Sequence, residues 1–328
     1  MRLATVGTSW ITRDLIAAAR QQGRLEPWAV CSRTMERGRA FGAENGIQRV
    51  FDSYEALLAD PQVDVVYLGT PNSLHFSQMK AALLAGKAVI CEKPFVSNME
   101  ELHQIKALVE ERDGMVFEAI TTCYVPNFHR LRDALNQIGP VHAARLEFTQ
   151  KSSRFDALKN GSRITAFDRN YSGGALYDIG VYAVHLAAGL FGKPEKVFCI
   201  SNWQQQDIDT SDALLLGYPE MVCSVLCSKD SHSDQRSVIQ GENGYLLIQG
   251  SPAYCDDIQL CLAGQEPVTI SEPRQWQRIT YELDHFVSAF ERHDLDAVRR
   301  GLEQSERVMD ILCRARMHCG LRFAADEQ

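Results

Sequence analysis

The stretch "RLATVGTSWITRDLIAAARQQG", residues 2–23, begins as an apolar strand, turns at one glycine and continues with the periodicity of an amphipathic helix. Similar apolar runs return at 27–33, 63–70, 88–93 and 115–120, and helical patterns separate them. Strands and helices that alternate at this spacing are typical of a parallel, doubly wound sheet. We therefore predict an α/β fold for the first 118 residues.

The pattern changes after about residue 120, where longer and often alternating apolar runs appear at 142–150, 212–218, 221–228 and 244–250. These runs predict an open-faced, mainly antiparallel sheet, and helical patterns flank them at about 174–191, 276–293 and 295–318. A chain of 328 residues also exceeds the usual size of one hydrophobic core. We predict two domains, 1–118 and an α+β domain at 119–328, with C-terminal residues free to pack back on the first.

The composition excludes several classes of protein. The chain has 34 basic and 42 acidic residues, a net charge of −8, and no block of like charge, so we expect no nucleic-acid partner. We also expect no membrane segment and no signal peptide, because no apolar run approaches bilayer length. The 10 cysteines form no CxxC pairs, which predicts a reduced cytoplasmic protein with core cysteines and no metal site.

The loop after the first strand permits two interpretations. Gly7 fits the first glycine of a dinucleotide-binding turn, but Ser9 and Thr12 replace the second and third glycines. The loop is either an ordinary turn whose helix Ser9 or Thr12 caps, or a modified pyrophosphate cradle in which Ser9 donates to a phosphate. The repeated strand–helix context favours the cradle, formed by Gly7, Thr8, Ser9, Trp10 and Ile11.

The end of the second strand bears on the choice of cofactor. An acidic residue there would bind the ribose of NAD, but this chain has Ser32 and Arg33. A hydroxyl beside a guanidinium suits a 2′-phosphate, so we expect NADP(H) rather than NAD(H). Arg37 either adds to this site or is a solvated surface side chain.

Two further motifs follow strands of the predicted parallel sheet. "GTPNSLH" (69–75) and "CEKPF" (91–95) lie at carboxyl ends of strands, where open α/β sheets bind ligands. Pro94 fixes the direction of Lys93, and its own peptide bond is a candidate for unusual geometry. The predicted cofactor contacts here are Thr70, Pro71, Asn72, Glu92 and Lys93.

"TPNSLH", "EKPF" and "GGALYDIGVY" together resemble the glucose–fructose oxidoreductase, inositol dehydrogenase and MocA-type family over nearly the whole chain. The resemblance implies a Rossmann domain, a second domain that dimerises through its sheet, and hydride transfer at a carbon bearing a hydroxyl. It implies Lys93 as the catalytic lysine, with Asp178 and Tyr182 completing the substrate site. It also implies that His75 lies near the nicotinamide and that Glu118 helps to close that pocket.

The residues of the third motif agree with this expectation. On one helix, Asp178, Tyr182 and His185 lie on one face, although Tyr182 and His185 also suit hydrogen-bonded core positions. We expect Tyr182 to meet Lys93 across a bound nicotinamide and to exchange the proton of the substrate hydroxyl, with its pKa lowered by the ammonium. Lys93 as the acid or base stays an equal alternative, and we expect Asp178 to orient either the substrate hydroxyl or Lys93.

The substrate class is less specified by the sequence. We expect a small polyhydroxylated compound, and the loop 151–170 either rims its site or is a solvated connector. Two rivals remain: a non-catalytic dinucleotide sensor of the same fold, and a scaffold whose cofactor site Ser9 blocks. We also expect a homodimer or higher homo-oligomer through the second sheet.

Overall fold

The computed structural model describes residues 1–204 and 207–327 and divides into two compact units. Unit 1 comprises Met1–Ala119 and Trp276–Glu303, and unit 2 comprises Ile120–Gln275 and Gln304–Gln328. The domain boundary expected after residue 118 stays a prediction. Residues 205, 206 and 328 of the predicted second domain lie outside the described residues.

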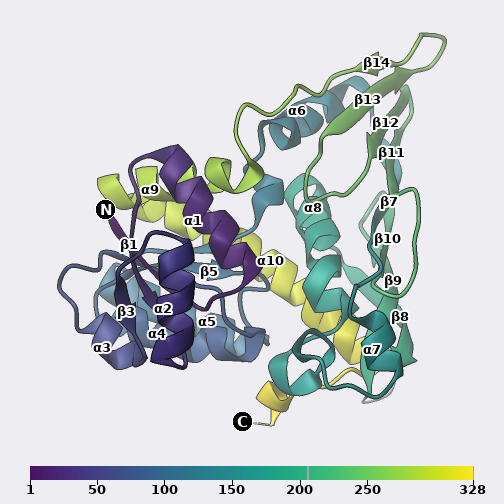
Figure 1. Cartoon of the computed structure of the whole chain (residues 1–328). Helices are drawn as coiled ribbons and strands as arrows, with labels where there is room; N and C mark the ends of the chain where they lie inside the picture. Colours follow the sequence, from purple (N-terminus) through teal and green to yellow (C-terminus); the bar gives the residue numbers. More distant parts are fainter. Residues whose placement is uncertain (205–206, 328) are drawn as a thin grey trace. The chain divides into compact units, whose positions relative to one another are not determined.

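Unit 1 contains the predicted parallel sheet, of which β1, β3 and β5 are labelled in Figure 1, and its six strands follow the order β3-β2-β1-β4-β5-β6. This is the order of a dinucleotide-binding Rossmann sheet, so the predicted fold class is confirmed. The strands are β1 (Arg2–Val6), β2 (Glu26–Cys31), β3 (Arg49–Phe51), β4 (Val65–Leu68), β5 (Ala88–Glu92) and β6 (Val116–Ala119). The helices are α1 (Trp10–Gln22), α2 (Met35–Glu44), α3 (Tyr54–Leu58), α4 (His75–Leu84), α5 (Met99–Arg112) and α9 (Arg278–Arg292), and Leu295 begins α10.

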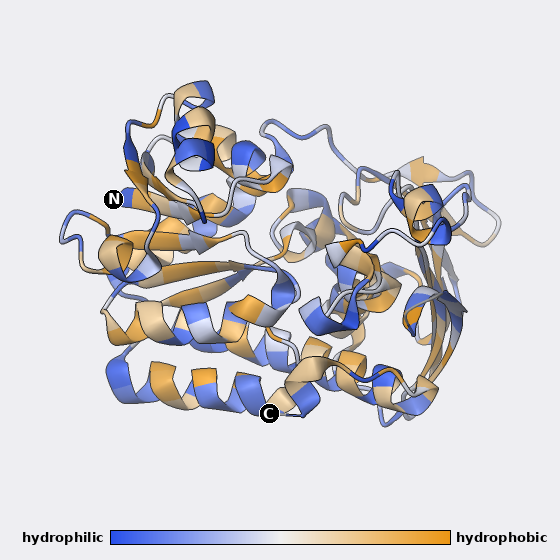
Figure 2. Cartoon of the chain, turned by 60° about the horizontal axis from the view of Figure 1, so that its bottom comes forward, coloured by the Kyte–Doolittle hydropathy of each residue, from blue (hydrophilic) through white to orange (hydrophobic). Residues whose placement is uncertain are grey.

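Local chemistry explains where the helices of unit 1 begin. The side chains of Ser9, Thr34 and Asn98 cap α1, α2 and α5 by accepting backbone N–H bonds. The central strands are apolar and buried, whereas the helices alternate apolar and polar residues (Figure 2). Each of these helices follows the carboxyl end of a strand along the chain, which is where the predicted cofactor residues lie.

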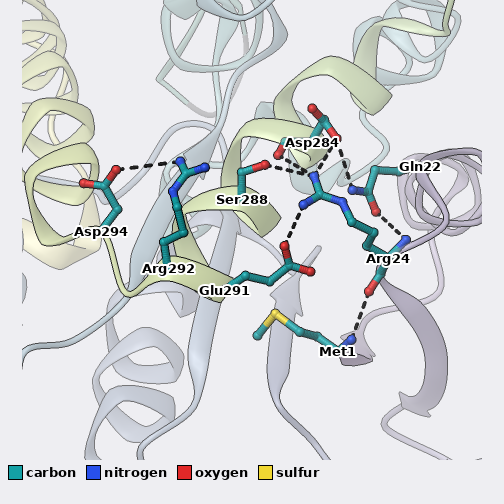
Figure 3. A network of polar contacts seen from close by, with 8 residues as sticks. All are labelled: Met1, Gln22, Arg24, Asp284, Ser288, Glu291, Arg292 and Asp294. Atoms are coloured by element: carbon teal, nitrogen blue, oxygen red, sulfur yellow. Dashed lines mark hydrogen bonds and ion pairs between the residues drawn. The ribbon is translucent and has the colours of Figure 1, made fainter.

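A segment distant in sequence completes unit 1. Arg24 donates from its two terminal nitrogens to Glu291 Oε2 (2.6 Å), Asp284 Oδ1 (2.7 Å) and Ser288 Oγ (2.9 Å) of α9 (Figure 3). Phe286 of the same helix stacks on Phe117 of β6 with ring centroids 4.7 Å apart. Apolar stacking thus joins α9 to the sheet, and this polar network joins it to the loop before β2.

Unit 2 is built on an eight-stranded sheet with the order β14-β13-β12-β11-β7-β10-β9-β8. All neighbouring strands are antiparallel except β7 and β10, so the predicted mainly antiparallel sheet is confirmed. The strands are β7 (Val141–Thr149), β8 (Lys196–Gln204), β9 (Ile208–Gly217), β10 (Val222–Ser228), β11 (Arg236–Gly241), β12 (Gly244–Gln249), β13 (Asp257–Leu262) and β14 (Val268–Thr269).

The helices of unit 2 include a core helix that packs on this sheet. The helices are α6 (Pro126–Ala134), α7 (Phe155–Lys159), a π-helical turn (Leu176–Gly180) and α8 (Val181–Phe191). The helix α10 (Leu295–Cys319) belongs to unit 2 from Gln304 onward. Short 3₁₀ turns span Asn72–Leu74 in unit 1 and Thr121–Cys123, Leu135–Gln137, Thr165–Phe167, Arg169–Tyr171 and Ala324–Asp326 in unit 2. The α8 helix contacts β7 and β10 (Figure 1).

The expectation that no apolar run approaches bilayer length was wrong for one segment of this core helix. The segment Arg169–Phe191, 23 residues with a mean hydropathy of 1.3 in its most apolar window, is long and apolar enough to cross a membrane. Within the protein, however, 72% of that window is buried. Its apolar character is explained by packing against the sheet, since a helix buried on most sides is apolar nearly all round.

Candidate active site

The loop after β1 requires a glycine at its first position. Gly7 has φ +107°, and a Cβ there would lie 2.5 Å from the carbonyl oxygen of Gly69. Ser9 is the N-cap of α1: its hydroxyl accepts from the backbone N–H of Thr12 (3.4 Å) and lies 3.1 Å from the Thr12 hydroxyl. This loop is compatible with Ser9 as a helix cap and also with a pyrophosphate cradle. The first N–H groups of a helix have no intrahelical partners, so those that the cap does not use can bind a phosphate.

A change on a neighbouring strand compensates for Thr12. The third glycine of the usual motif lets the helix approach the sheet closely, and here Thr12 is buried at that place. A Cβ on Gly69, directly after β4, would lie 2.8 Å from the Thr12 hydroxyl. The space that the motif normally gains at position 12 is therefore supplied by position 69.

The loops after β1 and β2 are joined by Arg37. Thr34 caps α2 by accepting from the N–H of Arg37, and the Arg37 Nε donates to the Thr8 hydroxyl at 2.7 Å. Ser32 is buried at the end of β2, while Arg33 beside it is exposed. Two guanidinium groups therefore belong to the segment that follows the second strand.

His75 joins the loops after β4 and β5. It is fully buried, with Nδ1 3.0 Å from the Pro94 carbonyl oxygen and Nε2 3.1 Å from that of Thr70. Burial lowers the pKa of the imidazole, which therefore donates to one carbonyl at a time. The structure thus gives His75 a role in tying two loops, and the cofactor contact expected of it stays a prediction.

The β5 loop carries Lys93, and the Lys93–Pro94 peptide bond is cis. The unusual geometry expected at Pro94 is thus confirmed. Glu92 precedes Lys93 and accepts from the Tyr67 hydroxyl at 2.8 Å. Burial raises the pKa of Glu92, whereas the Lys93 ammonium and the Tyr67 hydrogen bond oppose this rise. Lys93 therefore leaves the sheet from a strand end that is held by a hydrogen bond between the buried Tyr67 and the half-buried Glu92.

The other predicted cofactor residues gather at the same edge of the sheet. These are Trp10 and Ile11 in the first turn of α1, Pro71 and Asn72 after β4, and Glu118 in β6. A dinucleotide fits this edge, because Gly7 lets the β1 loop lie directly against the Gly69 carbonyl and the N-terminus of α1 supplies N–H groups for a pyrophosphate. The residues that would hold it are those of the β1, β2, β4 and β5 loops.

In unit 2 the double glycine of "GGALYDIGVY" makes room for a carboxylate. Asp209 is buried at the start of β9, and its Oδ2 accepts from the backbone N–H of Leu176 at 2.7 Å. Gly174 has φ +106°, and a Cβ there would lie 1.9 Å from Asp209 Oδ1. Asp209 thus satisfies the start of the helix, and Gly174 allows it to approach.

Asp209 forms a buried pair with Asp212. Burial raises the pKa of both groups, and that of Asp212 rises further because the Asp209 charge lies beside it. Ser201 Oγ donates to Asp212 Oδ1 at 2.5 Å, and Cys227 Sγ lies 3.5 Å from Asp212 Oδ2. Burial and the neighbouring carboxyl therefore both disfavour the ionised form of Asp212 beneath the motif.

The three polar residues of the predicted helical face have different surroundings. Asp178 lies in the π-helical turn and is ion-paired with the buried Lys229 of unit 2. Tyr182 lies four residues on, partly buried, with its ring 5.5 Å from that of Phe148. His185 is fully buried within α8. Asp178 and Tyr182 are thus the partly exposed members of this face.

The sequence interpretation missed Lys229 and Asp209. A signal for Lys229 exists, since a lysine directly after the apolar strand "MVCSVLCS" has to place its charge against some partner. Asp209 has a weaker signal, an aspartate at the start of a strand that gives no indication of its distant partner Leu176. The predicted core role of the cysteines is confirmed for eight of ten, which are buried.

Comparison with known proteins identifies the family. A model described as "Oxidoreductase family, NAD-binding Rossmann fold" matches residues 1–120, and the GFO/IDH/MocA C-terminal domain matches residues 128–247. The chain belongs to the GFO/IDH/MocA family. The resemblance predicted from the three motifs is thus confirmed, and the family makes the protein an NAD(P)-dependent oxidoreductase rather than a non-catalytic sensor.

Members of this family with full-length similarity include two named dehydrogenases. The chain is 31% identical to the scyllo-inositol 2-dehydrogenase (NADP(+)) IolU of Bacillus subtilis, over 100% of this chain and 99% of that protein. It is 30% identical to the trans-1,2-dihydrobenzene-1,2-diol dehydrogenase of Homo sapiens, with the same coverage. Among solved structures, KijD10, a 3-ketoreductase from Actinomadura kijaniata in complex with NADP and TDP-benzene, has a TM-score of 0.86 at 20% identity over 97% of both chains. This last likeness supports the fold.

Proposed function

We propose that the protein is a dehydrogenase or reductase that transfers hydride between a nicotinamide and a hydroxyl-bearing carbon of a sugar, cyclitol or dihydrodiol-like substrate. The observation that carries the substrate class is the full-length similarity to two relatives whose names describe a cyclitol and a cyclic diol. Such a substrate agrees with the small polyhydroxylated compound expected from the sequence.

Three side chains carry the proposed chemistry. The bound nicotinamide supplies or accepts the hydride. Tyr182 exchanges the proton of the reacting hydroxyl, Lys93 supplies positive charge for that exchange or performs it, and Asp178 orients the substrate hydroxyl. The Asp178–Lys229 ion pair and the packing of Tyr182 on Phe148 support fixed positions for the two residues of unit 2.

NADP(H) is the proposed cofactor. Ser32 and Arg33 stand where an acidic residue would select NAD, and Arg37 is fixed to the Thr8 hydroxyl of the first loop. Guanidinium groups suit a 2′-phosphate because they donate charge-assisted bonds in a fork. The NADP(+) in the name of the B. subtilis relative agrees with this choice.

The exposed face of the unit 2 sheet is the proposed surface for a second copy of the chain. Ile200 of β8, Leu215 of β9 and Val222 of β10 expose 77%, 60% and 62% of their surface on neighbouring strands. Contiguous exposed apolar residues mark interaction sites. Sedimentation should give a dimer or larger assembly, and Ile200→Glu should weaken it; a wild-type monomer at micromolar concentration would contradict this.

The proposed location is the cytoplasm. All ten cysteines are free thiols, eight of them buried, which suits a reducing compartment. Fractionation of cells that express the native protein would test this, with the activity expected in the cytosolic fraction and its recovery in a secreted fraction counting against it.

The decisive experiment is an oxidation panel with purified protein. NADP⁺ and NAD⁺ are offered with inositols, aldoses and cyclic diols, and absorbance at 340 nm is followed as NAD(P)H forms. We expect turnover with ring polyols and NADP⁺, and severe loss in Tyr182→Phe with NADPH affinity unchanged. Activity confined to acyclic alcohols, or full activity in Tyr182→Phe, would refute the proposal.

A further inference from the structure

Lys229 is a buried lysine in a firmly held turn. It follows β10 directly, and 5% of its side chain is exposed. Its backbone N–H donates to Thr210 O at 2.8 Å, and its carbonyl accepts from the N–H of Ser152 at 2.9 Å. Burying an ammonium is costly unless a partner compensates, so the direction of this side chain is expected to be set by its partners.

The neighbours of Lys229 reinforce this turn. Asp230 accepts hydrogen bonds from Asn202 Nδ2 (3.0 Å), Thr210 Oγ1 (2.7 Å) and Ser228 Oγ (2.7 Å). These donors come from three strands, so the residue after Lys229 is bound to β8, β9 and β10 at once. The backbone that carries the lysine has little freedom to move.

The ammonium is directed at the substrate motif. Lys229 Nζ donates to Asp178 Oδ2, and it lies 4.3 Å from the ring centroid of Phe167, a cation–π distance. The two ends of this ion pair differ, because the lysine side chain is 5% exposed and the aspartate side chain 35% exposed. The pair therefore fixes one carboxylate oxygen from the protein side.

The backbone of Asp178 is held by a separate device. Two residues earlier, the N–H of Leu176 donates to the buried Asp209, whose approach depends on Gly174. One anion thus anchors the main chain of the turn, and one cation anchors the side chain. Such double anchoring is what a group needs if it is to present a carboxylate in one orientation.

We propose that Lys229 is a positioning residue for the hydride-transfer reaction, which fixes the Asp178 carboxylate toward the substrate hydroxyl and supplies its counter-charge. This inference rests on the proposed function, in which Asp178 orients the substrate. Lys229 itself does not touch the reacting atoms. Its removal should impair substrate turnover while leaving dinucleotide binding, a property of unit 1, unchanged.

The test compares Lys229→Met, Lys229→Arg, Asp178→Asn and the double variant Lys229→Met/Asp178→Asn in the full-length protein. Lys193→Met is the matched control, since Lys193 also pairs with an aspartate of unit 2, Asp310 at 3.1 Å, but is 59% exposed. Measured quantities are kcat and KM for the most active ring polyol, the NADPH dissociation constant and the melting temperature. Lys229→Gln replaces Lys229→Met if the latter does not fold.

We expect Lys229→Met to lower kcat/KM about 10- to 100-fold, as misplacing a reacting group does. The NADPH dissociation constant should stay within about twofold, and Lys229→Arg should recover much of the loss because it keeps the charge. Added to Asp178→Asn, Lys229→Met should cost less than about twofold more, because residues that act as a unit are not additive. Lys193→Met should match the wild type.

Three results would overturn the inference. Wild-type activity in Lys229→Met, beside a strong loss in Asp178→Asn, would remove the positioning role and leave the proposed function intact. Independent losses that multiply in the double variant would show that Lys229 acts through another group, such as Asp209, whose pKa its charge lowers. Absence of hydride transfer in the wild type, or wild-type activity in Asp178→Asn, would remove the proposed function together with this role.

Discussion

Gly174→Ala tests why the substrate motif contains a double glycine. Gly174 has φ +106°, so a side chain there adopts a backbone conformation that costs about 1–3 kcal/mol. The new Cβ would also lie 1.9 Å from Asp209 Oδ1, and the carboxylate has to move away from the Leu176 N–H that it now accepts at 2.7 Å. A lost hydrogen bond to a charged group adds about 1.5–3 kcal/mol. The sum is about 2.5–6 kcal/mol.

Gly161→Ala separates these two contributions. Gly161 also belongs to unit 2 and has φ +85°, but a Cβ there would meet nothing within 4 Å. This control therefore pays only the backbone cost of about 1–3 kcal/mol. The free energy of unfolding of the wild type and both variants is measured in urea by linear extrapolation, with circular dichroism and tryptophan fluorescence as probes.

The prediction is that Gly174→Ala destabilises the protein by about 2 kcal/mol more than Gly161→Ala does. Gly174→Ala should also lower turnover, because Asp178 lies in the same helical turn as Leu176, whose N–H Asp209 binds. Equal destabilisation by the two substitutions would show that Asp209 does not need the space at Gly174. The account of the double glycine would then be wrong.

Three further predictions concern unit 1. Burial lowers the pKa of His75 below 6.5, so the unfolded chain binds a proton at this residue before the folded protein does as pH falls. The melting temperature should therefore decrease from pH 7 to pH 5. His75→Gln should flatten this slope, and an unchanged slope would contradict the assignment. In urea unfolding, Arg24→Ala should destabilise the protein by about 1 kcal/mol in low salt and by less in 1 M NaCl. Arg13→Ala is the control, because it breaks a single exposed ion pair and should have no measurable effect. Arg33→Ala should weaken NADPH binding at least about tenfold by calorimetry and leave NADH binding unchanged; equal effects on both would contradict a 2′-phosphate site.

Local patterns were enough to predict most of the parallel sheet and the longer helices, but they missed four strands of the second sheet, β8, β11, β13 and β14. The apolar strands of the parallel sheet and the helices expected at 174–191, 276–293 and 295–318 lie close to their observed positions. The short strand Arg49–Phe51 was missed, because three residues carry too little periodicity to distinguish a strand from a loop. The π-helical turn at Leu176–Gly180 was also missed, since it depends on tertiary contacts.

Positions that depend on distant partners could not be predicted. From the sequence alone, Thr12 departs from the glycine motif without explanation. The structure shows that Gly69, which has no side chain, leaves room for the Thr12 hydroxyl. Lys229 and Asp209 contact the GGALYD turn from positions that lie 30 or more residues away in the sequence. Sequence periodicity specifies which face of an element is buried, but not which polar group on another strand will meet it.

Transfer of deuterium from the nicotinamide to a substrate carbon tests the central claim most directly. NADPH labelled with deuterium at its transferable position is incubated with the full-length protein and the keto forms of inositols and cyclic diols, and the products are examined by mass spectrometry. The account predicts one deuterium on the carbon that becomes hydroxyl-bearing, with little transfer by Lys93→Met or Tyr182→Phe. Tight NADPH binding with no deuterium in any product would contradict it.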